Sequence, residues 1–111
     1  MSAGSRYLMI ESQGPWSGPN ASRFVRDAGE LAAAGHEVVL LLVQDGVLAA
    51  VPEASTAVRG VLDGGGQVWV DGFSLRQRAL AATAPPAGTV LVEMDAVAEE
   101  LLSTDGQAVW H

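Results

Sequence analysis

The sequence predicts an α/β protein built on a parallel β-sheet. Short apolar segments alternate with stretches of helical periodicity, glycine or proline separates many of them, and residues 38–43 are apolar at every position. An uninterrupted apolar strand is typical of a parallel sheet that helices cover on both faces. Strands that alternate with helical patterns of about 10–15 residues pair through right-handed βαβ crossovers.

The first half of the chain predicts two strands and one long helix. Residues 7–10 form a short apolar run that leads into the polar loop 11–19, as a buried strand would. Asn20 is expected to cap the next helix, and Gly35 to end it. One face of this helix carries Phe24, Val25, Ala28, Leu31 and Ala32. Residues 38–43 follow as the most central strand.

The second half repeats the alternation. Residues 47–51 form a small apolar turn that Pro52 ends. The expected strands are residues 67–70, 89–92 and 107–110. The expected helices are residues 55–62, residues 73–82 and a segment whose apolar face carries Met94, Val97, Ala98, Leu101 and Leu102.

The composition favours one domain and excludes thiol chemistry. A chain of 111 residues that is 49% hydrophobic is expected to fold as a single domain, residues 1–111, around one core. The chain has no cysteine, so it contains no thiolate nucleophile, no persulfide, no disulfide and no cysteine metal site.

Charge and hydropathy limit the possible partners. All six basic residues are arginine and the formal net charge is −7, which disfavours direct binding to nucleic acid because such binding depends on neutralising phosphates. No apolar run approaches the ~20 residues needed to cross a bilayer. The first residues lack the apolar stretch of a signal peptide, so we expect a cytoplasmic protein with no membrane contact.

Functional residues are expected at the carboxyl ends of the strands, where parallel sheets bind their ligands. Four segments reach that edge: residues 11–20, 44–45, 71–76 and 93–95. The loop before Asn20 opens a helix but lacks the lysine and hydroxyl of a phosphate-binding P-loop, so no nucleotide cofactor is expected. Trp16 in this loop is either an exposed contact residue or a residue packed under a neighbouring subunit, and the interface is favoured.

Asp71 is the carboxylate with the clearest position. It follows a strand and precedes a helix, and capping that helix explains an aspartate there. As a general base it would need burial or a neighbouring carboxylate such as Asp45 to raise its pKa. Arg76 and Arg78 lie two residues apart on the helix, so at most one of them faces a pocket, and surface ion pairs are the commoner arrangement.

Neither histidine is expected to be catalytic. His36 precedes a strand at the opposite end of the sheet, and His111 is the last residue of the sequence. No metal site is expected, because no histidine pair or carboxylate cluster has the spacing of metal ligands. A serine triad is not expected either, because Ser12, Ser17 and Ser74 have no histidine partner in a recognisable pattern.

Several segments, in this order, resemble the DsrE/DsrF-like sulfur-relay family. They are Gly14-Pro15 through Asn20, Ala33-Ala34-Gly35-His36-Glu37-Val38, Gln44-Asp45-Gly46-Val47, Val68-Trp69-Val70-Asp71 with the residues from Leu75 to Leu80, and the tail from Val97 to Trp110. The likeness extends over nearly the whole chain. It implies a three-layer α/β/α sandwich on a mostly parallel five-stranded sheet, and assembly into trimers or hexamers.

The resemblance also implies where the chemistry of the family would lie. Active members carry sulfur as a persulfide on a cysteine at the end of the third strand, and Asp71 matches that position. A carboxylate forms no persulfide, so sulfur transfer of this kind is not expected here.

Two hypotheses follow from this difference. In the first, the chain is a non-catalytic binding or assembly subunit, either a homo-oligomer or docked on a DsrE-like subunit that supplies cysteine. In the second, it is a small-molecule-binding protein or an enzyme that uses Asp71 as a general base. The ligand-binding residues would then be Trp16, Asn20, Gln44, Asp45, Phe73 and Arg76. The first is favoured because capping explains Asp71 and no second catalytic group is evident.

Overall fold

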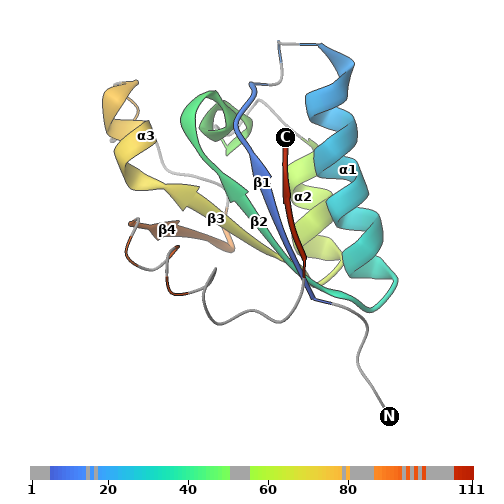
Figure 1. Ribbon diagram of the computed structural model, residues 1–111. Coiled ribbons are helices and arrows are strands. Elements are labelled where there is room, and N and C mark those ends of the chain that lie inside the picture. The colour runs from blue at the N-terminus through green and yellow to red at the C-terminus, as the bar shows by residue number, and fades with distance from the viewer. Residues whose placement is uncertain are drawn as a thin grey trace.

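The strands form one parallel sheet (Figure 1). The computed structural model describes residues 6–14, 16, 18–50, 56–78, 80, 87–93, 95, 97, 99 and 107–111. The strands are β1 (Arg6–Glu11), β2 (Glu37–Leu42), β3 (Gln67–Asp71), β4 (Thr89–Val92) and β5 (Gln107–Trp110). Their order is β4-β3-β2-β1-β5, and every neighbouring pair is parallel. The predicted α/β class and five-stranded sheet are confirmed.

Helices cover both faces of the sheet. The helices are α1 (Pro19–Ala33), the 3₁₀ helix η2 (Gln44–Ala50), α2 (Thr56–Asp63) and α3 (Gly72–Gln77). α1 and α2 lie side by side on one face (Figure 1). Residues 95, 97 and 99 are also helical, and Val97 is buried against the opposite face. None of the described helices is long and apolar enough to cross a membrane.

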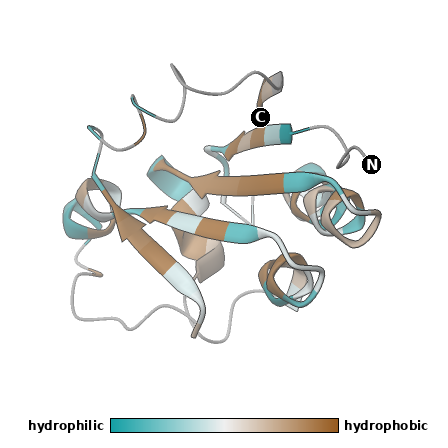
Figure 2. Ribbon diagram, turned by 90° about the horizontal axis from the view of Figure 1, so that it is seen from below, coloured by the Kyte–Doolittle hydropathy of each residue, from teal (hydrophilic) through white to brown (hydrophobic). Residues whose placement is uncertain are grey.

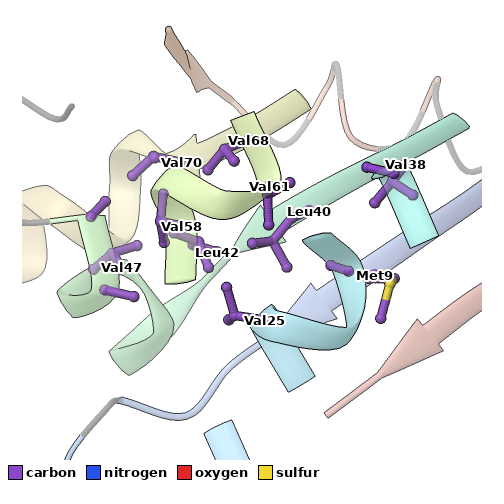
Figure 3. Packing of buried hydrophobic residues seen from close by; sticks show 14 of the residues in the cluster. Met9, Val25, Val38, Leu40, Leu42, Val47, Val58, Val61, Val68 and Val70 are labelled. Atoms are coloured by element: carbon purple, nitrogen blue, oxygen red, sulfur yellow. The ribbon is translucent and has the colours of Figure 1, made fainter. Parts of the chain in front are cut away.

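The first core cluster fills the space between the sheet and the pair α1–α2 (Figure 3). Side chains at alternate positions of β2, Leu40 and Leu42, point into it, and Val25 of α1 and Val58 of α2 meet them. The helical spacing of three and four residues brings Ala21, Val25, Ala28 and Ala32 to the buried side of α1.

The second core cluster lies on the other face of the sheet. It contains Val39 and Leu41, so β2 is buried on both sides, as its continuous apolar sequence predicts. In Figure 2 the strands are brown over most of their length, whereas α1 carries both brown and teal. Strand register aligns one row of side chains across this face: Trp110, Ile10, Leu41, Trp69 and Val90.

The start of α1 differs from the prediction. The cap residue is Gly18, with φ 130°, which has no side chain to bond the free amides of the first turn. Pro19 is the first helical residue, where a missing N–H costs nothing. The expectation that Asn20 caps this helix is therefore wrong, because Asn20 already lies inside the first turn.

The helix after β3 is shorter than predicted. α3 ends at Gln77, and the amides of Arg78 and Leu80 both bond to the carbonyl of Leu75, at 3.1 and 2.9 Å. The amide of Leu80 thus bonds to a carbonyl five residues earlier in the chain, and this bond closes the helix as in a Schellman turn. Residues 79, 81 and 82 of the predicted helix lie outside the described residues, as do Met94, Ala98, Leu101 and Leu102.

Candidate functional site

Two clusters of polar side chains lie at the carboxyl ends of the strands. One surrounds Asp71, at the end of β3, and includes Gln44, which follows β2. The other surrounds Glu11, at the end of β1, beside the end of β5. Parallel pairing brings these residues to one edge, as predicted.

Asp71 is a buried helix cap. Its side chain is 4% exposed, and its Oδ2 accepts hydrogen bonds from the backbone N–H of Ser74 at 3.2 Å and from the Ser74 hydroxyl at 2.6 Å. The Ser74 hydroxyl in turn accepts the amide N–H of Gln44 at 2.8 Å. Gln44 adopts φ 52°, a left-handed conformation that turns its amide toward α3. The structure thus ties the end of β2 to the start of α3 through one hydroxyl.

The second carboxylate oxygen of Asp71 is unpaired. Oδ1 is buried and has no hydrogen-bond partner within the described part of the chain. Gly72 follows at a crowded point, because a Cβ there would clash with the carboxylate of Glu93 and lie 3.2 Å from Nη1 of Arg76. Asp71 and Gly72 therefore form a tight junction between β3 and α3.

The two arginines of this segment take separate partners, as their spacing predicts. Nη2 of Arg76 lies 3.0 Å from Oε1 of Glu93, and Nη2 of Arg78 lies 2.8 Å from Oδ1 of Asp45. Arg78 also donates to the carbonyl of Ser74 at 3.2 Å. Asp45 is thus engaged by Arg78. These pairs are exposed, so each contributes only about 0–1 kcal/mol to the free energy of unfolding.

Three aromatic side chains are exposed near these strand ends. Trp16 is 72% exposed, Phe73 is 53% exposed and Trp110 is 66% exposed. They follow β1, follow β3 and end β5, respectively. We call these three residues the strand-end aromatics. Asn20, in the first turn of α1, is exposed as well.

Glu11 and His111 form a pair that the sequence analysis missed. Glu11 is 1% exposed, and its two carboxylate oxygens lie 2.8 and 3.0 Å from Nδ1 of His111. The amide N–H of Gln13 donates to Oε2 of Glu11 at 3.0 Å. The carboxylate is therefore buried with partners on both sides, as a buried charge requires.

The imidazole of His111 is held by more than Glu11. Its ring stacks on Phe24 of α1 with centroids 5.1 Å apart. Its backbone N–H donates to the carbonyl of Ile10 at 2.8 Å, and its carbonyl accepts the hydroxyl of Ser12 at 2.7 Å. No local sequence signal marks this pair, because it depends on the pairing of β1 with β5, in which Ile10 aligns with Trp110.

Two cavities lined by described residues lie away from both polar clusters. An open groove of about 590 Å³ runs between α1 and α2, lined by residues such as Arg26, Glu30 and Thr56. A second hollow of about 360 Å³ lies at the amino ends of β2 and β3, near Glu37 and Gln67. No group of metal-binding side chains is found among the residues that the structure describes.

Comparison with known proteins finds the fold but no sequence relative. No protein-family model matches the chain, and no curated protein matches it. The chain is similar to the YchN protein of Escherichia coli, with a TM-score of 0.82 and 13% identity over 97% of this chain and 100% of that one. It is also similar to BT1422, a conserved protein of unknown function from Bacteroides thetaiotaomicron, with a TM-score of 0.68 and 14% identity over 95% and 94% of the two chains.

Proposed function

We propose that this chain, which has the DsrE/DsrF-like fold of YchN and no cysteine, is a non-catalytic assembly subunit that associates with copies of itself. The observation that carries the proposal is the use of Asp71. At Asp71, the position that the family resemblance matches to the acceptor cysteine, this chain has a buried carboxylate that caps α3.

The chemistry of Asp71 supports a structural use. Its Oδ2 already accepts two hydrogen bonds from Ser74, and the nearest arginines bind Glu93 and Asp45 instead. A carboxylate cannot hold a persulfide sulfur, and the chain has no other thiol. Sulfur relay through this subunit would therefore need a partner that supplies the cysteine.

The strand-end aromatics support assembly. Trp16, Phe73 and Trp110 are each more than half exposed on the same edge of the sheet. Tryptophan and other aromatic residues are enriched in protein interfaces, where they account for much of the binding energy. Arg76 and Arg78 at this edge are already paired with Glu93 and Asp45, so these four charges are neutralised within the chain beside the exposed aromatic surface. Trimers or hexamers are the assemblies that the family resemblance implies.

Light scattering coupled to size-exclusion chromatography tests the proposal. The chain has a mass of 11.5 kDa, and we expect a discrete species several times larger at micromolar concentration. Trp16→Ala combined with Trp110→Ala should shift this species toward the monomer. Arg59→Ala, an exposed change on α2, is the control and should leave the mass unchanged.

Two results would contradict the proposal. One is a wild-type protein that elutes as a monodisperse monomer at micromolar concentration. The other is a monomer that forms a stoichiometric complex with a cysteine-bearing DsrE-like subunit, because that complex would assign the strand-end aromatics to a different partner.

The buried Oδ1 of Asp71 favours a second candidate function. An unpaired carboxylate oxygen inside a protein commonly marks an unfilled hydrogen-bonding site. In that case Asp71 would bind a small molecule or act as a general base, with Trp16, Asn20, Gln44, Asp45, Phe73 and Arg76 around the ligand. Asp71→Asn keeps the size of the side chain and removes its basicity. Loss of a ligand or an activity in this variant, with the fold intact, would favour the second candidate.

A further inference from the structure

The most completely buried acidic group of the described chain is Glu11, and its partner is His111. Burying a carboxylate is costly unless hydrogen bonds replace its water. Glu11 receives one from the amide of Gln13 at 3.0 Å, and Nδ1 of His111 lies 2.8 Å from Oε2. An ionised carboxylate can only accept, so a hydrogen on Nδ1 completes this contact. The arrangement leaves Nε2 as the nitrogen with the free lone pair when the imidazole is neutral.

Nε2 is the atom of this pair that no described residue contacts by a hydrogen bond. All hydrogen bonds of the His111 ring to described residues involve Nδ1. The ring is a quarter exposed, with 26% of the side chain accessible, and Phe24 covers one of its faces. A carboxylate that fixes the tautomer and orientation of a histidine is the usual means of preparing the other ring nitrogen to accept a proton or bind a ligand.

We propose that Nε2 of His111, with Glu11 as its positioning residue, is a proton-accepting site for a small uncharged ligand that donates a hydrogen bond from a hydroxyl or amine. An uncharged ligand fits because the neutral imidazole that accepts its hydrogen bond carries no charge to attract an anion, and because a chain of net charge −7 repels anions. Phe24 beside the ring adds an apolar wall. This site is independent of the proposed assembly surface. Trp110 and His111 are consecutive residues of an extended chain, so their side chains point to opposite faces of the sheet.

The alternative is that the Glu11–His111 pair only holds the end of β5 against β1. The two readings differ in what Glu11→Gln does to His111. If Glu11 prepares Nε2, the neutral glutamine should make His111 less reactive. If Glu11 only holds the strand end, weakening its contact with His111 should expose the imidazole and make the ring more reactive.

Acylation by diethyl pyrocarbonate, followed by peptide mass spectrometry, measures this reactivity. The lone pair of Nε2 attacks a carbonyl carbon of the reagent and forms an N–C bond, and the C–O bond to the leaving ethyl carbonate breaks. The ring gives up its Nδ1 proton, and the protonated ethyl carbonate decomposes into carbon dioxide and ethanol. His36 is an internal control in the same protein, because its Nδ1 is buried and no described carboxylate bonds to it.

We expect His111 to be acylated faster than His36, and Glu11→Gln to slow the acylation of His111 about tenfold while leaving His36 unchanged. An unchanged or faster reaction at His111 in the folded variant would overturn the proposal. The ¹⁵N spectrum of the wild-type imidazoles gives a test that needs no variant. The proposal requires the Nδ1–H tautomer at His111, and the Nε2–H tautomer there would also overturn it.

Discussion

Ile10 of β1 and Trp110 of β5 are register partners in the sheet, and this pairing brings Glu11 and His111 side by side. The two strand ends are thereby joined by a buried carboxylate and an imidazole, in addition to the backbone. The side chain of Trp110 lies in the same row as Ile10 and Leu41 but is 66% exposed. One edge of the sheet therefore combines a buried polar pair with an exposed tryptophan.

The cap of α3 gives the first prediction. Asp71→Ala removes both hydrogen bonds to Ser74, and we expect it to lower the free energy of unfolding by about 1–2 kcal/mol. Asp71→Asn keeps an amide oxygen that can accept the Ser74 amide, so it should cost less, about 1 kcal/mol at most. Urea denaturation followed by circular dichroism measures both. Equal losses in the two variants would show that the capping bond is not what Asp71 contributes.

The close approach of η2 to β1 gives the second prediction. A Cβ at Gly46 would clash with the backbone carbonyl of Glu11, which is held in the sheet and cannot move away. Gly46→Ala should therefore lower the free energy of unfolding by about 1–3 kcal/mol.

Gly60→Ala is the matched control for this change. A Cβ there meets nothing within 4 Å, and alanine is a better helix former than glycine, so α2 should be stabilised by up to about 1 kcal/mol. Thermal unfolding of the two variants separates the effects. A Gly46→Ala protein as stable as the wild type would mean that η2 and β1 are farther apart than described.

The absence of cysteine gives the third prediction. Incubation with a cysteine desulfurase and ³⁵S-labelled cysteine should leave no covalent sulfur on the chain, because no side chain can form a persulfide. Denaturing electrophoresis with autoradiography measures the label, and a cysteine-bearing sulfur carrier serves as the positive control. A band of stable label at 11.5 kDa would contradict the prediction.

Much of the fold follows from local patterns in the sequence. The apolar run of β2 predicts a strand buried on both faces, and Leu40 and Leu41 indeed belong to the two different core clusters. Asp71 caps α3, as its place between a strand and a helix predicts. The cap of α1 was predicted wrongly, because Gly18 with its positive φ serves where a polar side chain at position 20 was expected.

Within the candidate site, the sequence determined the absence of a thiol, the separate partners of Arg76 and Arg78, and the position of Asp71 at a strand end. These features depend on composition or on residues a few positions apart. The pairing of Glu11 with His111, 100 residues apart, was decided only by the tertiary structure. Strand order depends on how all the apolar faces are buried together, and no local spacing encodes which strand becomes the neighbour of β1.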